Sequence, residues 1–226
     1  MGTDDFFKKR KQAAKERKYE VRPARPNSFL IVSEGTKTEP FYFDGLAEYI
    51  NHEYESSINV AKPQLDIHGE GKCTVSLVEA AANIDSRAHI VYGHRWVVFD
   101  KDDFNDFDEA IKLANSYGFK VAWSNQCFEY WVYLHFHYSD SALHRDDWFE
   151  KLDMLFKNLG IVDGYKKNNE DIFNIATTRG SLKYAIANAI RMELSHNKYK
   201  KPSQCDPCTN VHNLILELQP YISKLL

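Results

Sequence analysis

Two short acidic segments carry the residue types best suited to chemistry. Asp100, Asp102 and Asp103 follow a run of four apolar residues, and Glu34 follows a similar run earlier in the chain. Two carboxylates about 4 Å apart repel by roughly 4 kcal/mol at an effective dielectric constant near 20. Such a pair therefore turns to water, shares a proton or holds a cation. Oxygen ligands of this kind suit Mg²⁺ or Mn²⁺.

The elements that must position these carboxylates are two buried strands. The apolar runs at 29–32 and 96–99 are rich in β-branched and aromatic residues, which predicts strands covered on both faces. In open α/β sheets, ligands bind beyond the carboxyl ends of the strands. If the two strands are parallel neighbours, Glu34, Asp100 and Asp102 converge on one crevice.

Helices are expected to follow both acidic turns. Gly35 permits a tight turn, and Pro40 suits the first turn of a helix that begins near Thr38. Lys37 and the N-terminus of this helix would add positive potential to the crevice. Glu129 lies in the first turn of a later helix, where it interacts either with that helix dipole or with a cation.

Composition excludes few function classes, because the net charge of the 226 residues is only −3 and the sequence pI is about 6.3. The charge is uneven, since residues 1–26 contain nine Lys and Arg against four Asp and Glu. Residues 1–28 are therefore interpreted as a basic N-terminal arm, which either solubilises the chain or contacts the phosphates of a nucleic acid.

The sequence has no apolar run long enough to cross a membrane and no apolar segment of a signal peptide after the basic N-terminus. We therefore expect a cytoplasmic protein whose four cysteines are reduced. Cys205 and Cys208, with His196 and His212 nearby, form a weak zinc pattern with unusual histidine spacing, so surface thiols are the default interpretation.

The predicted architecture is an α/β protein with a mainly parallel sheet flanked by helices. Residues 29–140 form this α/β domain, and residues 141–226 form a helical C-terminal part packed on it. The second part becomes more polar and contains a basic loop with Lys166 and Lys167, which we expect to contact nucleic acid.

At the acidic turns the sequence resembles known proteins. A strand ending in Glu34-Gly35 and a later strand ending in Asp100-Lys101-Asp102 are similar to the Toprim domain of topoisomerases, primases and certain nucleases. More closely, the chain resembles the RloB-like family of defence-associated proteins. The similar stretches are residues 30–43, 96–103, 124–131, 165–167 and 207–212.

This resemblance implies a Toprim-like fold and a nuclease of anti-phage defence or abortive infection, which acts on DNA or RNA and is linked to restriction-modification or other defence proteins. In such a hydrolase, Asp100 and Asp102 would hold Mg²⁺ or Mn²⁺, and Glu34 would bind the metal or transfer a proton. Asp103 and Glu129 would be outer ligands or ligands of a second metal. Lys37 would neutralise the transferring phosphoryl group.

Two other functions remain open from the sequence. The chain could be a non-catalytic module that binds nucleic acid or a partner protein through its basic arm and its basic loop. A phosphoacceptor role for Asp100 is the weaker alternative, because it needs an acidic pair on an earlier strand and only Glu34 is present there.

Overall fold

A computed structural model describes residues 23–55 and 62–226. Residues 1–22 of the predicted N-terminal arm therefore lie outside the described residues. The fold is built on a five-stranded sheet with the order β2-β1-β3-β4-β5. The first four strands in this order are parallel, and β5 is antiparallel to β4. The strands are β1 (Arg25–Ser33), β2 (Gln64–Gly69), β3 (Tyr92–Asp100), β4 (Lys120–Asn125) and β5 (Cys208–Thr209).

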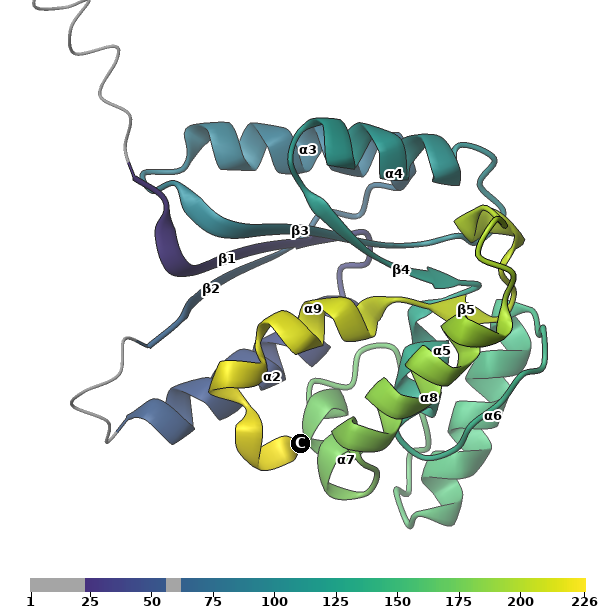
Figure 1. Ribbon diagram of the computed structural model, residues 1–226. Coiled ribbons are helices and arrows are strands. Elements are labelled where there is room, and N and C mark those ends of the chain that lie inside the picture. The colour runs from purple at the N-terminus through teal and green to yellow at the C-terminus, as the bar shows by residue number, and fades with distance from the viewer. Residues whose placement is uncertain (1–22, 56–61) are drawn as a thin grey trace, which may run out of the picture.

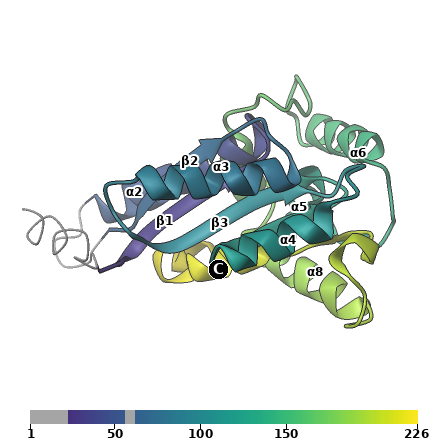
Figure 2. The same ribbon diagram turned by 90° about the horizontal axis from the view of Figure 1, so that it is seen from above.

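Helices cover both faces of the sheet, as predicted for strands without alternating polar residues. Figure 1 shows α3 (Thr74–Arg87) and α4 (Phe107–Ser116) on one face, with α2 (Thr38–Tyr54) and α9 (Val211–Glu217) on the other. Seen from above in Figure 2, α3 and α4 lie side by side over the strands. The predicted strand residues 29–32 and 96–99 are all buried between these two layers.

The strand order reverses between β1 and β3. From β1 the chain moves outward through α2 to β2, and then crosses back through α3 to β3 on the other side of β1. The two central strands are in register, with Val32 opposite Val97 and Ser33 opposite Val98. Their carboxyl ends therefore lie together at a topological switch point, where a crevice forms in open α/β sheets.

The C-terminal part is mainly helical, as expected, and it also completes the sheet. Its strand β5 pairs with β4 through Ser124–Thr209 and Asn125–Cys208. Its helices are α6 (Arg145–Asn158), α7 (Ile172–Thr178), α8 (Leu182–Ser195) and α9, and they follow the short α5 (Phe128–Tyr133). At the other end, β1 begins at Arg25, which pairs with Tyr92, so the last four residues of the predicted arm belong to the sheet.

Of the helices in the described part of the chain, none is long and apolar enough to cross a membrane.

The end of β2 packs directly against the turn that follows β1. A Cβ at Gly69 would lie 2.7 Å from the Gly35 carbonyl oxygen and 2.7 Å from Pro40 Cγ. Both distances are shorter than the contacts that Cβ atoms make in proteins. The Gly35 carbonyl oxygen belongs to the backbone, so it cannot move aside as a flexible side chain could.

Gly69→Ala is therefore expected to lower the free energy of unfolding by about 1–3 kcal/mol, the usual cost of overpacking. Urea unfolding at constant pH measures the change. Lys72→Ala, at an exposed position in the same loop, is the control and should change stability by less than about 0.5 kcal/mol. Equal stability of Gly69→Ala and the wild type would contradict this close approach.

Candidate functional site

A cavity of about 240 Å³ opens at the carboxyl ends of β1 and β3. It brings together most of the predicted site residues, which come from four separate parts of the chain. The lining residues are Glu34, Gly35, Thr36, Lys37, Thr38, Glu39, Asp100, Asp102, Glu129 and Lys167. The predicted convergence of Glu34, Asp100 and Asp102 is therefore confirmed.

Asp100 is held by the helix that begins after β4. Its Oδ2 accepts a hydrogen bond of 2.9 Å from the amide of Phe128, the first residue of α5. Its Oδ1 is buried and has no hydrogen-bond partner among the described residues. Because a buried carboxylate oxygen without a partner is costly, this atom marks a place where a cation or proton would stabilise the site.

Glu34 approaches Asp100 from the neighbouring strand. The Asp100 amide lies 3.4 Å from Glu34 Oε2, at the long limit of a hydrogen bond. The Glu34 amide donates to the Val98 carbonyl at 2.8 Å, which continues the β1–β3 ladder to the edge of the cavity. The sheet itself thus sets the relative position of the two carboxylates.

Asp102 and Asp103 lie in the turn between β3 and α4 and differ in exposure. Asp102 has a φ of 39°, in the left-handed region that is unusual for a residue other than glycine. It lines the cavity and pairs with Arg145 of α6 at 3.0 Å. Asp103 lies outside the cavity, its side chain is 80% exposed, and it is 3.8 Å from the same guanidinium.

Two further carboxylates of the cavity are buried. Glu129, in the first turn of α5, is 3% exposed and accepts a hydrogen bond from the Tyr165 hydroxyl. Glu39, in the first turn of α2, is 7% exposed and was missed by the sequence analysis. Its carboxylate folds back onto the Cα of Gly35. The only sequence signal for Glu39 was its position five residues after Glu34.

The crowding of carboxylates changes their protonation. Burial raises the pKa of Glu34 to about 8; the hydrogen bond from the Asp100 amide lowers it in part, and the charges of Asp102 and Glu39 raise it further. Burial also raises the pKa of Glu39 to about 7, with the charge of Glu129 as the next cause.

Asp100 is affected in the same way. Burial raises the pKa of Asp100 well above its usual range, and the negative charges of Glu39, Glu129 and Glu34 raise it further. Without a cation, the folded chain therefore keeps protons on part of this cluster near neutral pH.

The donor set fits a hard divalent cation, because it consists of carboxylate oxygens and includes the unpartnered Asp100 Oδ1. As the side chains stand, however, the described residues contain no group of three or more His, Cys, Asp and Glu arranged to hold a metal ion.

The predicted lysines separate into two groups. Lys37 and Lys167 line the cavity, the first from the turn before α2 and the second from the loop between α6 and α7. Lys167 Nζ lies 4.3 Å from the centre of the Phe149 ring, which holds this side chain by a cation–π contact. Lys166 does not line the cavity, and its Nζ lies 3.3 Å from Asp163.

Among the described residues, the cysteine pair is not part of any group of three or more possible metal ligands. Cys205 and Cys208 are free but buried, so the expectation of surface thiols is wrong. His212 Nε2 lies 3.4 Å from Glu193, and His196 Nε2 lies 2.9 Å from the Pro207 carbonyl oxygen.

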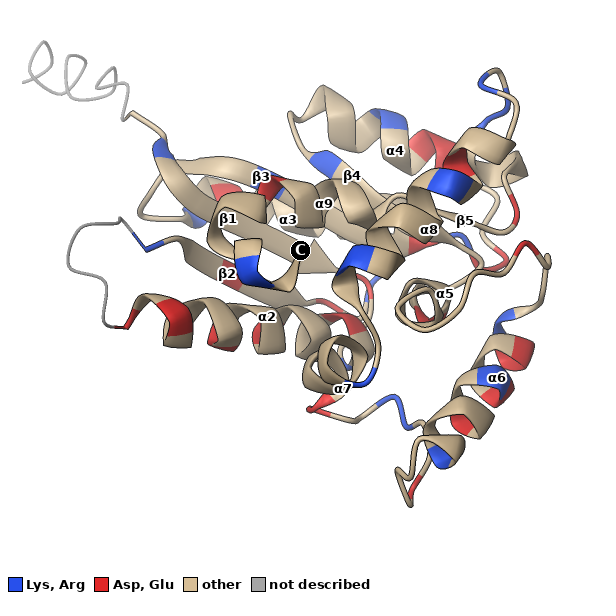
Figure 3. Ribbon diagram, turned by 60° about the horizontal axis from the view of Figure 1, so that its bottom comes forward, with Lys and Arg blue, Asp and Glu red and all other residues tan. Residues whose placement is uncertain are grey.

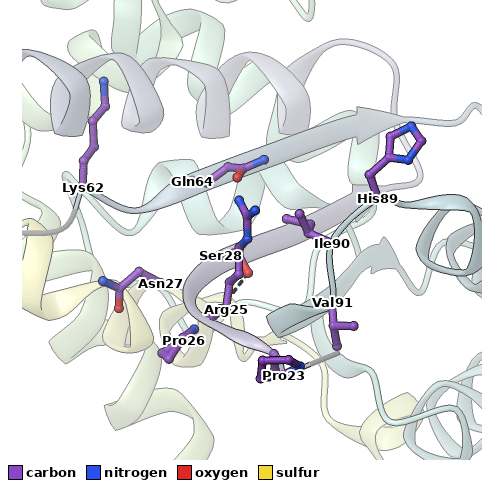
Figure 4. A pocket seen from close by; sticks show the side chains of 11 residues that line it. Pro23, Arg25, Pro26, Asn27, Ser28, Lys62, Gln64, His89, Ile90 and Val91 are labelled. Carbon is purple, nitrogen blue, oxygen red and sulfur yellow. Dashed lines mark hydrogen bonds between the residues drawn. The ribbon is translucent and has the colours of Figure 1, made fainter. Parts of the chain in front are cut away.

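A larger hollow of about 540 Å³ lies between the first residues of β1 and β2 and the segment just before β3 (Figure 4). Its charged or titratable side chains among the described residues are those of Arg25, Lys62 and His89. Its described lining contains no carboxylate, and it lies away from the strand ends that carry Glu34 and Asp100, so the smaller cavity is the candidate site.

Without divalent cations, the free energy of unfolding should fall as pH rises from about 4.5 to 8. Glu34 has a folded pKa of about 8 against a usual value of 4.5, so in this interval the folded state holds a proton that the unfolded chain releases. This stabilisation is complete below pH 4.5 and is lost as pH rises through 8. One proton accounts for at most about 1.4 kcal/mol per pH unit.

Urea unfolding in chelator between pH 5 and 8 measures this slope, and Glu34→Gln should reduce it. Glu70→Gln is the matched control, because Glu70 follows β2 and pairs with Lys72 outside the cavity. A slope that is the same in Glu34→Gln and the wild type would contradict the assignment.

Comparison with known proteins supports one relationship. The family model described as RloB-like protein matches residues 29–218. No curated protein and no solved structure matches the chain. The matched segment contains every residue that lines the cavity, together with Arg145 and Tyr165. Because it covers most of the sequence, the chain belongs to the RloB-like protein family.

Proposed function

We propose that this protein is a metal-dependent phosphoryl-transfer enzyme, a nuclease that cuts DNA or RNA in anti-phage defence. The observation that carries the proposal is the convergence of Glu34 and Asp100 in one cavity at the switch point of the sheet, where Asp100 Oδ1 is buried and has no hydrogen-bond partner in the described part of the chain. Ligands bind at such points in open α/β sheets. The defence setting follows from the family resemblance.

Asp100, Asp102, Glu34 and Glu129 would hold Mg²⁺ or Mn²⁺. A bound divalent ion polarises a phosphoryl oxygen and makes bound water a better nucleophile. The proposal needs this cation, because the carboxylates alone would repel a phosphodiester. Its binding would require carboxylate side chains to rearrange, including release of Asp102 from Arg145. Asp103, next to Asp102 at the cavity edge, would support the same ion from outside.

The two lysines would bind the substrate. Lys37 and Lys167 line the cavity from different segments, so a phosphate that enters would meet positive charge on both. Lys37 would offset charge that develops on the phosphoryl group, and Lys167 would hold the backbone. Lys166 is outside the cavity and would contact only a longer nucleic acid.

The surface around the cavity restricts how a nucleic acid could approach. Helix α2 carries Asp and Glu and no Lys or Arg, whereas α6 carries both signs of charge (Figure 3). A polyanion would therefore avoid α2 and approach from the side of α6 and the loop that follows it. The predicted basic arm would add phosphate contacts, which would make binding sensitive to salt.

A non-catalytic binding module is the competing function. The pairing of Asp102 with Arg145 favours it, because a carboxylate already neutralised by a guanidinium needs no cation. In that case the protein would bind nucleic acid equally well in chelator and would cleave none.

Divalent cations should stabilise the folded protein. A cation at 100 times its dissociation constant adds about 2.7 kcal/mol to the free energy of unfolding. The effect should be larger at pH 8 than at pH 6, because protons compete for the carboxylates. Thermal unfolding with and without Mn²⁺ measures it. The shift should disappear in Asp100→Asn and persist in Glu70→Gln; an equal shift in both variants would place the ion elsewhere.

Cleavage of labelled single- and double-stranded DNA, RNA and tRNA with Mg²⁺ or Mn²⁺ tests the activity. Asp100→Asn and Glu34→Gln should each slow cutting by more than the roughly 10- to 100-fold typical of losing a group that only supports a ligand. Both substitutions keep the side-chain shape, and Glu70→Gln should cut like the wild type. If no substrate is cut, or if Asp100→Asn and Glu34→Gln cut normally, the proposed function is wrong.

A further inference from the structure

Residues 164–167, here called the strap, connect the C-terminal part to the candidate site. They lie in the loop between α6 and α7, and the first of them, Gly164, has a φ of 64°. The Tyr165 amide donates to Asp153 Oδ1 of α6 at 3.2 Å, which anchors the strap at its base. At its other end, Lys167 lines the cavity.

Tyr165 is the part of the strap that reaches the buried carboxylates. Its ring packs against Phe149 and Phe156, with centroid distances of 6.3 and 5.8 Å. Its hydroxyl donates to Glu129 Oε1 and lies 3.2 Å from Thr38 Oγ1. Thr38 Oγ1 is also 3.2 Å from the Lys167 carbonyl oxygen, so the first residue of α2 contacts the strap at two points.

The single hydroxyl proton of Tyr165 goes to Glu129. The Thr38 hydroxyl donates its own proton to the Lys167 carbonyl, so it does not compete with Tyr165 for the carboxylate. Glu129 depends on this donor, because it is 3% exposed and a buried carboxylate is costly without donors. Asp100 and Glu34 accept hydrogen bonds from backbone amides. Asp102 pairs with the Arg145 side chain, and Glu129 accepts from the Tyr165 side chain, 36 residues away.

We propose that Tyr165 is a positioning residue that fixes the Glu129 carboxylate in the cavity, so that the α/β site depends on the strap for its geometry. The proposal rests on the proposed function, in which Glu129 helps to hold the divalent cation. Outer partners of this kind orient a metal ligand, and their loss typically reduces metal affinity or activity roughly 10- to 100-fold. Tyr165 itself touches neither metal nor substrate.

The test measures Mn²⁺ affinity of the full chain by titration calorimetry. Tyr165→Phe keeps the ring and removes only the hydroxyl, and it should weaken Mn²⁺ binding roughly 10-fold. Glu129→Gln should weaken it as well, and the double variant should bind no more weakly than Glu129→Gln alone, because Tyr165 acts through Glu129. Raising the Mn²⁺ concentration should restore the cleavage rate of Tyr165→Phe towards that of the wild type.

Tyr130→Phe is the matched control. Tyr130 is also buried and adjoins Glu129 in sequence, but its hydroxyl donates to the Ser139 carbonyl at 2.9 Å, away from the cavity. The Mn²⁺ affinity of the Tyr130→Phe variant should stay within about 2-fold of that of the wild type. If Tyr165→Phe does not fold by circular dichroism, Thr38→Val, which removes the hydroxyl on the other side of the Tyr165 oxygen, should weaken Mn²⁺ binding in the same direction.

The outcomes separate the two proposals. A wild type that binds and cleaves with Mn²⁺, beside a folded Tyr165→Phe with unchanged affinity, overturns the role of Tyr165 and leaves the nuclease proposal standing. Losses that add up in the double variant also overturn it, because Tyr165 would then act independently of Glu129. A wild type that neither binds Mn²⁺ nor cleaves overturns both.

Discussion

Several carboxylates, some of them buried, share one cavity, and their mutual repulsion is the constraint on which the rest of the structure depends. Glu39 and Glu129 are buried, and one buried oxygen of Asp100 accepts no hydrogen bond from residues 23–55 or 62–226. Like charges this close cannot all be ionised in a medium of low dielectric constant. The raised pKa values of Glu34 and Glu39 show one solution, which is to keep protons. The Arg145 guanidinium on Asp102 shows another.

The sheet holds the carboxylates in place despite their repulsion, because its central strands are buried on both faces. The four apolar residues of β1 and the four of β3 lie between two layers of helices, and their burial stabilises the positions of the strand ends. Further supports come from later in the chain. The amide of Phe128 holds Asp100, and the hydroxyl of Tyr165 holds Glu129. The carboxylates therefore do not have to stabilise their own arrangement.

The same arrangement explains why a cation, a proton and a guanidinium are alternatives at this site. A divalent ion would replace the protons of Glu34 and Glu39 and would compete with Arg145 for Asp102. In this member of the RloB-like family, the same few side chains thus determine the pH dependence of folding stability and carry the proposed chemistry. Lys37 and Lys167 stand beside the carboxylates as the groups that would receive an anionic substrate.

The sequence by itself determined the core of this picture. Unbroken apolar runs specify buried parallel strands, and polar residues directly after such strands lie at one edge of the sheet, so the convergence of Glu34, Asp100 and Asp102 could be predicted. Glu129 and Lys37 were found in the same way, because they begin the helices that follow strand ends.

Tertiary structure alone decided the remaining features, because they depend on contacts between distant segments. The rotation of α2 about its axis buries Glu39, and a left-handed turn sends Asp102 inward while Asp103 faces solvent. The packing of Tyr165 on α6 selects Lys167 over Lys166 for the cavity. Strand β5 pairs with residues more than 80 positions earlier. Local periodicity records which face of an element is apolar, but it does not record which partner that face will meet.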